Sequence, residues 1–280
     1  MKDIVIILRA CDAVEAVNNN GVRPLGHNKK DIVKNCVTTL FESINFADCE
    51  GFTYKLLIIK DNLSKETEER LKARLIRFGI DAEWRESNGH GNINSFKTCY
   101  EYALGLEDGQ FFLFIEDDYV CDKNSVSELI KFYRMFDKSS NRFFINPSSD
   151  LGDYKIVTET NGKYDKTVVL PGAKSGIGIW WRQVYHSTST FATTAKTLRW
   201  YKYVFDVVVS EKRLHQYVRN RIYKECPCFA PLYPLMEHFQ KPKTLYWFDE
   251  KNDGQDFVYK SDKIFYRKDK QTVDITPWNK

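Results

Sequence analysis

The stretch Phe111-Phe112-Leu113-Phe114-Ile115-Glu116-Asp117-Asp118-Tyr119 decides the fold of this chain. Five apolar residues run without polar alternation into three consecutive carboxylates. An unbroken apolar run of this length predicts a strand that is covered on both faces, as in the parallel sheets of α/β proteins. Because ligands of such sheets bind beyond the carboxyl ends of the strands, the three acids are expected at a binding edge.

These three acids predict a cation site. Carboxylates packed together repel one another, which raises the cost of ionising them unless a cation lies between them. Side chains two positions apart on a strand share a face, so Glu116 and Asp118 would point together and Asp117 away, unless a turn after Ile115 lets all three converge. Oxygen ligands that leave open positions suit Mg²⁺ or Mn²⁺ bound together with a diphosphate. The alternative is an acidic turn that only solubilises the end of a strand.

The sequence before this stretch alternates strands with amphipathic helices. Strands are expected at 4–8, 54–61 and 82–85, and helices after Asn28, after Ser64 and from the Gly- and Asn-rich loop 87–95. This rhythm predicts a right-handed, mostly parallel sheet. The loop 9–27 is long enough to bind a ligand. A further helix at 125–136 and a strand at 143–146 follow, and the pattern is less regular beyond them.

The length and composition fit one α/β domain over residues 1–280, with a nucleotide-binding half at 1–122. The net charge of +4 says little by itself, whereas 15% aromatic residues supply flat surfaces suited to stacking. Seven scattered cysteines, an odd count, predict reduced thiols rather than a disulfide framework. No stretch approaches about 20 apolar residues, so we expect a cytoplasmic protein with no membrane partner.

The order of these features resembles the nucleotide-sugar glycosyltransferases of the GT-A fold. Glu116-Asp117-Asp118 stands where that family carries its Asp-any-Asp motif, after a first strand with its Arg9 loop, a second strand ending at Asp61 and the loop 87–95. The resemblance covers residues 3–120 and is patchy afterwards. It implies a Rossmann-like mixed, mostly parallel sheet flanked by helices, and an acceptor-binding half at 123–280.

The resemblance also implies roles for single residues. Asp118 would coordinate Mn²⁺ or Mg²⁺ directly, and Glu116 and Asp117 would approach the ribose or the metal through water. The donor would be a nucleoside-diphosphate sugar such as a UDP-sugar. The residues expected beside its base and ribose are Arg9, Asp61, Asn92, Asn94 and Ser95.

Two later segments also match the family. His238, in the stretch 233–239, would reach back to the metal or the diphosphate; the alternative is a satisfied surface or core histidine. The Gly-rich segment 171–182 is similar to the family's acceptor segment, and Trp180 within it could stack on a sugar or a base. The alternative is a bulged strand with a tryptophan in the core.

An inverting transferase needs a carboxylate that takes the proton of the acceptor hydroxyl. The family usually places it between the glycine segment and the late histidine, where this chain offers Asp206 and Glu211. Asp206 is favoured, because the apolar neighbours in the sequence would desolvate it and make it more basic. The alternative is that either acid decorates the following helix, and a retaining mechanism would need no such base.

The basic segment 196–224 raises the question of the acceptor. It holds eight basic and two acidic residues before Glu225, interleaved with Trp200 and Tyr203 among other aromatic residues. This combination is typical of nucleic-acid binding, although a charge run is also found on solvated helix faces. The run 207–209 of three valines argues against one continuous helix through the segment.

Two classes of function follow. The first is an enzyme whose acceptor is a glycan or a hydroxymethylated base in DNA, as for the DNA glycosyltransferases of some bacteriophages, working in the cytoplasm of a bacterium or an infected host. The second is a non-catalytic protein that binds a nucleotide or a polyanion. A nucleotidyltransferase is a further rival, but no Gly-rich triphosphate loop with Lys or Arg follows the first strand.

Overall fold

The computed structural model describes residues 2–13, 28–136, 142–148, 181–184, 190–211, 222–223, 225–231 and 234–238. Its strands are β1 (Ile4–Ala10), β2 (Tyr54–Lys60), β3 (Ala82–Glu86), β4 (Phe111–Glu116), β5 (Tyr119–Cys121), β6 (Phe144–Ile145), β7 (Trp181–Val184), β8 (Phe191–Thr194), β9 (Cys228–Pro231) and β10 (Met236–His238). Its helices are α1 (Lys29–Cys49), α2 (Lys65–Phe78), α3 (Asn92–Leu104), α4 (Ser125–Phe136), α6 (Ala195–Trp200) and α7 (Lys202–Glu211).

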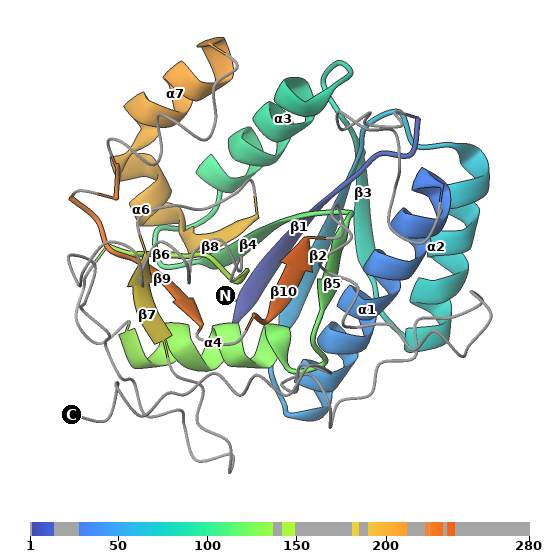
Figure 1. Ribbon diagram of the computed structural model, residues 1–280, viewed down its shortest axis with the longest axis horizontal. Helices are drawn as coiled ribbons and strands as arrows, with labels where there is room; N and C mark the ends of the chain where they lie inside the picture. Colours follow the sequence, from blue (N-terminus) through green and yellow to red (C-terminus); the bar gives the residue numbers. More distant parts are fainter. Residues whose placement is uncertain are drawn as a thin grey trace, which may run out of the picture.

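Within these ranges, one mixed sheet has the order β3-β2-β1-β4-β8-β6-β9-β7 (Figure 1). The first four strands in this order pair in parallel, as the alternation of strands and helices predicts, and β8 pairs antiparallel to β4. The chain leaves β1 toward β2 and β3, then returns to place β4 on the other side of β1. Such a reversal opens a crevice at the carboxyl ends of β1 and β4, where α/β proteins bind ligands.

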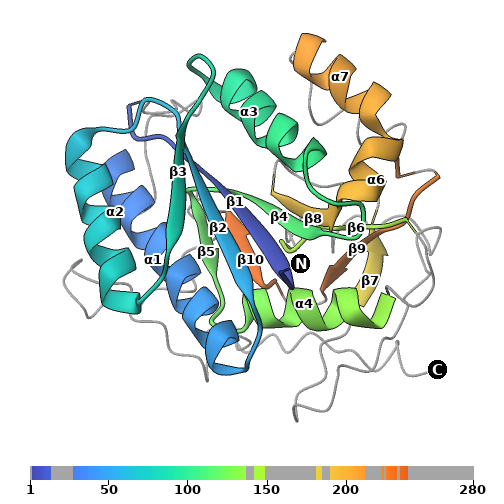
Figure 2. The same cartoon turned by 180° about the vertical axis from the view of Figure 1, so that it is seen from behind.

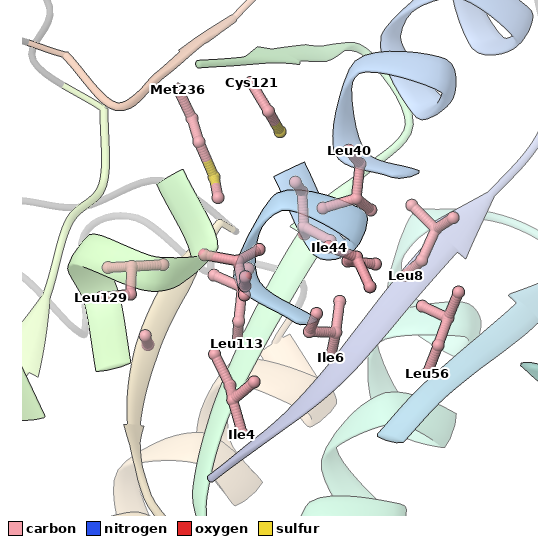
Figure 3. Close-up of a cluster of buried hydrophobic side chains, with 14 of the residues drawn as sticks. Ile4, Ile6, Leu8, Leu40, Ile44, Leu56, Leu113, Cys121, Leu129 and Met236 are labelled. Carbon is pink, nitrogen blue, oxygen red and sulfur yellow. The ribbon is translucent and has the colours of Figure 1, made fainter. Parts of the chain in front are cut away.

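Helices cover both faces of the sheet, and this explains the unbroken apolar run in β4. Phe111, Leu113 and Ile115 belong to a core that includes residues of α1 and α4, whereas Phe112 and Phe114 pack on the other face with residues of α3, α6 and α7. Figure 3 shows part of the first core, and Figure 2 shows α3, α6 and α7 together on the opposite side from α1 and α4. The prediction of a strand buried on both faces is therefore confirmed.

The helices that lead to the site begin where their capping residues predict. The side chain of Asn28 accepts a hydrogen bond from the backbone N–H of Asp31 at the start of α1, and Ser64 caps α2 in the same way. Gly79 ends α2 with φ of +65°, a left-handed conformation that favours glycine. These caps define where α1 begins before β2 and where α2 begins and ends after it.

The second half of the chain adds strands to the same sheet, and a short pair of helices follows β8. α6 and α7 are separate, which agrees with the expectation that 196–224 is not one helix, but the break lies at Tyr201 and not at the three valines. The valines lie inside α7, where Val208 is fully buried. Packing against the sheet therefore outweighs the weak helix propensity of valine.

Within the described ranges, no helix has both the length and the apolar character needed to cross a bilayer.

Candidate functional site

The ends of β1 and β4 are joined by an ion pair. Arg9 and Glu116 are directly opposite in the register of the two strands, and the Nη2 of Arg9 donates to the Oε1 of Glu116. The Nη1 of Arg9 donates to both oxygens of Asn92 at the start of α3, with 2.8 Å to the backbone carbonyl. Burial alone would lower the pKa of Arg9, but the carboxylate of Glu116 outweighs it and the pKa is raised. Glu116 is thus engaged on the α3 side of the sheet.

Asp117 and Asp118 lie in the tight turn between β4 and β5, on the α1 side. The Nζ of Lys29, the first residue of α1, is 2.6 Å from the Oδ1 of Asp117 and 3.7 Å from the Oδ2 of Asp118. The backbone N–H of Cys11 donates to the Oδ2 of Asp117 at 2.5 Å. Burial raises the pKa of Asp117, and the Lys29 ammonium opposes this rise without cancelling it.

The C-terminal strand β10 brings His238 to the same turn. β10 pairs antiparallel with β5, His238 lies opposite Tyr119, and the two rings stack with centroids 4.7 Å apart. The Nε2 of His238 is 3.3 Å from the Oδ1 of Asp118. Burial alone would lower the pKa of His238, but the Asp118 carboxylate outweighs it and the pKa is raised. The structure therefore places the late histidine beside the acidic motif, and its role at a metal or diphosphate stays a prediction.

The three acids do not share one site in the way the sequence suggested. Neither alternative is found, because the turn begins after Glu116 and sends Asp117 and Asp118 to the α1 side while Glu116 stays with Arg9. In the described part of the chain, no group of three or more His, Cys, Asp or Glu side chains could hold a metal ion. Glu116 is paired with Arg9 in this structure, and its expected place around a metal with Asp118 stays a prediction.

A divalent ion fits the remaining donors in part. The carboxylate of Asp118 is a ligand that Mg²⁺ and Mn²⁺ prefer, and the imidazole of His238 lies beside it. The Oδ1 of Asp117 is already paired with Lys29. Two protein donors leave most of the coordination to other oxygens, which matches an ion that a diphosphate and water help to bind.

Asp61 organises the loop before α3. Its carboxylate is nearly fully buried and accepts a hydrogen bond at 3.0 Å from the backbone N–H of Gly91, whose φ of +93° favours glycine. Asn94 donates to the carbonyl of His90 at 2.8 Å, which closes the loop on the other side. The start of α3 thus presents Asn92, Asn94 and His90 on an exposed surface beside Asp61.

Ser95 does not join that surface. It is fully buried, and its hydroxyl donates to the carbonyl oxygens of Gly91 and Asn92 within the first turn of α3. Its expected contact with a nucleoside is therefore replaced by a structural role. The sequence could not separate Ser95 from Asn94, because both follow the same Gly-rich loop and burial depends on the sheet behind it.

Sequence reasoning missed Lys29 and Asp12. Lys29 follows the cap of α1, a position where the helix dipole disfavours a cation unless an anion compensates it, and this was the available signal. Asp12, just after β1, accepts hydrogen bonds from the backbone N–H of Ser64 at 2.7 Å and from the hydroxyls of Ser64 and Thr67. Asp12 therefore ties the end of β1 to the start of α2.

The expected acceptor residues lie apart from this edge or outside the described residues. Asp206 is exposed on α7, where the Nζ of Lys202 lies 2.6 Å from it and the hydroxyl of Tyr100 donates to it at 3.1 Å. The expectation that apolar neighbours desolvate Asp206 is wrong, because Asp206 lies on the exposed face of α7, opposite the buried Val208. The side chain of Glu211 and all of Trp180 lie outside the described residues.

The basic segment is described only in part, since 212–221 and Lys224 lie outside. Arg199 donates to the carbonyls of Leu104 and Leu106 and to Asp108, so it holds the end of α3. Trp200 is 61% exposed, with the guanidinium of Arg142 3.9 Å from its ring centroid. An exposed aromatic and cationic surface is therefore present, but the guanidinium of Arg199 is engaged in hydrogen bonds that hold the end of α3.

No protein family and no curated protein matches the sequence. Solved structures to which the chain is similar include the galactosyltransferase LgtC in complex with donor and acceptor sugar analogues, at 12% identity and a TM-score of 0.43 over 80% of this chain and 70% of that one. The glycosyltransferase GlyE of Streptococcus pneumoniae is similar at 8% identity and a TM-score of 0.43, over 85% and 54%. A TarS fragment from S. aureus is similar at 11% identity and a TM-score of 0.41, over 72% of this chain.

The chain spans about half of that TarS fragment, at 49% of its length.

Proposed function

We propose that this chain is a glycosyltransferase that moves a sugar from a nucleoside-diphosphate donor to a hydroxyl acceptor. The observation that carries the proposal is the meeting of Asp118 and His238 at the carboxyl ends of β1 and β4, where the strand order reverses. The contact between His238 and Asp118 supports a binding site over the alternative of an acidic turn that only solubilises the strand end. Ligands of α/β sheets bind at such a reversal.

The donor would lie across this edge. The buried carboxylate of Asp61 and the exposed amides of Asn92 and Asn94 offer hydrogen-bond acceptors and donors to a ribose and a base. The first turn of α3 adds backbone N–H groups and the positive end of the helix dipole, both suited to a diphosphate. Arg9 would act indirectly, because Glu116 and Asn92 hold its guanidinium in place.

Asp118 and His238 would hold Mn²⁺ or Mg²⁺ together with the diphosphate. When bound, the ion neutralises the negative charge that develops on the leaving diphosphate. In the transfer itself, the bond between the anomeric carbon and the diphosphate oxygen breaks, the acceptor oxygen bonds to that carbon, and the acceptor proton leaves to a base. Asp117 and Lys29 keep the turn in the conformation that presents Asp118.

The base and the stacking residue are proposals from the sequence alone. Asp206 and Glu211 are the candidate bases. For Asp206 to act, the acceptor would have to approach α7 and loosen its contact with Lys202. Trp180 stays the proposed stacking residue; its neighbour Trp181 is buried in the core beside Phe132 and is not available to a sugar.

The test is donor turnover in an Asp118→Asn variant. We expect the variant to lose Mn²⁺-dependent release of nucleoside diphosphate, and to lose the thermal stabilisation that Mn²⁺ and a matching UDP-sugar give the native chain. Asp108→Asn is the matched control, because Asp108 is an exposed acid that pairs with Arg199 away from the edge. Equal turnover in the native chain and in Asp118→Asn would refute the proposal.

The acceptor is proposed as a glycan or a hydroxymethylated base in DNA. The surface around Trp200, Tyr203 and Arg142 supports nucleic acid, because exposed rings and cations stack bases and pair with phosphates. Binding of duplex DNA that weakens steeply as salt is raised would support a DNA acceptor. No binding at low salt would leave the glycan. A protein that binds a nucleotide without turnover is the alternative, and it predicts donor stabilisation without product.

We further propose a cytoplasmic location. None of the seven cysteines, all of which lie in described segments, forms a disulfide, and this supports a reducing compartment.

A further inference from the structure

Lys29 holds an unusual position for a buried cation. It is the first residue of α1, where the unpaired N–H groups and the helix dipole disfavour positive charge, yet it is only 8% exposed. A buried ammonium requires anionic partners. Asp117 and Asp118 supply them from the turn between β4 and β5.

The two acids are not equivalent partners. Asp117 bonds Lys29 through one oxygen at 2.6 Å and the N–H of Cys11 through the other at 2.5 Å. The Oδ2 of Asp118 lies 3.7 Å from Lys29, too far for a hydrogen bond but near enough for strong attraction, while its Oδ1 faces His238. Lys29 is therefore bonded to Asp117 and acts on Asp118 through charge.

We propose that Lys29 is an internal competitor of the divalent ion at Asp118, so that the ion binds tightly only when a diphosphate binds with it. The ammonium already neutralises part of the charge of Asp118, and it would repel an ion bound to the same carboxylate. A diphosphate reverses the balance, because its oxygens attract both the ion and the ammonium. This inference rests on the proposed function, since it takes Asp118 as the metal ligand.

The proposal predicts a coupling between metal and nucleotide. Mn²⁺ alone should bind the native chain weakly, and uridine diphosphate should tighten its binding by about tenfold or more, because the diphosphate oxygens attract both the ion and the ammonium. Lys29→Met should tighten the binding of Mn²⁺ alone by about tenfold and reduce the effect of uridine diphosphate. Removing the ammonium of Lys29 and adding the diphosphate should thus both relieve the repulsion between Lys29 and the metal ion.

The experiment is a titration of each protein with Mn²⁺ alone and with uridine diphosphate present, followed by the electron paramagnetic resonance signal of free Mn²⁺. Lys30→Met is the matched control, since Lys30 is the next residue of α1 and pairs with Glu66 at 2.8 Å. The double variant Lys29→Met/Asp117→Asn removes both partners of the pair and leaves no unpaired buried charge, which protects the fold. Circular dichroism checks that each variant is folded.

The proposal is supported if Lys29→Met and the double variant both bind Mn²⁺ more tightly than the native chain while Lys30→Met does not. Unchanged or weaker binding in the double variant overturns it, because Asp117 would then be a ligand or Lys29 a mere structural anchor. Asp118→Asn separates this failure from that of the proposed function. If Asp118→Asn binds Mn²⁺ as the native chain does, the metal site itself is wrong.

Discussion

Because Arg9 and Glu116 form an ion pair, substitutions of the two residues should have non-additive effects on the free energy of unfolding. The side chains of Arg9 and Glu116 are 12% and 19% exposed, so the pair lies between a fully buried and a surface ion pair. Breaking one partner of a fully buried pair costs about 3–5 kcal/mol, whereas exposed pairs are worth about 1 kcal/mol or less. Because Arg9 also keeps the oxygens of Asn92 when Glu116 is removed, we expect Glu116→Met to lower the free energy of unfolding by about 2 kcal/mol.

The assay is a double-mutant cycle measured by urea unfolding. Arg9→Met should cost a similar amount, and the double variant should cost about 2 kcal/mol less than the sum of the single ones, because no buried charge is then left unpaired. Lys202 and Asp206 give the control cycle, since this pair is roughly half exposed and should couple by no more than about 0.5 kcal/mol.

Additive costs for Arg9 and Glu116, within about 0.5 kcal/mol, would refute this reasoning. The guanidinium of Arg9 would then have no measurable interaction energy with Glu116 and would be available to bind the donor directly. The slope of the unfolding free energy against urea serves as an internal check, because a changed slope would mean that the denatured state or the two-state behaviour has changed.

Three further predictions concern Asp12, the cysteines and Arg199. Asp12→Ala should lower the free energy of unfolding by about 1–3 kcal/mol in urea, because Ser64 and Thr67 lose their acceptor. Burial alone would raise the pKa of Asp12, but hydrogen bonds from those residues outweigh it and lower the pKa, so this stabilisation should be present above about pH 4 and be lost as the pH falls through the folded-state pKa. In the native protein, a thiol reagent should modify exposed Cys49 first and leave Cys99 unmodified, because burial raises the pKa of Cys99 to about 12; rapid labelling of Cys99 by mass spectrometry would contradict this. Arg199→Met should cost about 2 kcal/mol of stability, since its guanidinium binds two carbonyls, and a substitution that weakens DNA binding without this cost would contradict the structural role.

The periodicity of the sequence was enough to predict the sheet. Strands β1, β2 and β4 are short apolar runs, and helices α1 and α2 each begin at a side-chain cap, so local and long-range preferences agree there. The unbroken run 111–115 predicted burial on both faces because no position in it tolerates water. The strand at Phe144–Ile145 was predicted, but later strands such as Cys228–Pro231 and Met236–His238 are too short to give a clear period and were not.

The site was less predictable, because the partner of an acid is chosen by the fold. Glu116 is opposite Arg9, a residue 107 positions away, and Asp118 is beside His238 from the C-terminal strand. The histidine was found through a resemblance and not through its spacing. Lys29 was missed because a lysine at a helix start is unremarkable until the turn that carries Asp117 is placed next to it.

The consequence is that a three-acid motif need not be a three-acid site. Strand β4 divides the motif, since Glu116 is paired on the α3 side whereas Asp117 and Asp118 face α1. Substitution of each acid should therefore change a different property. Loss of Glu116 should lower stability at the β1–β4 edge, loss of Asp117 should release the ammonium of Lys29, and loss of Asp118 should remove the metal and the bound donor. Three unlike phenotypes from three adjacent carboxylates would be hard to explain if all three held one ion.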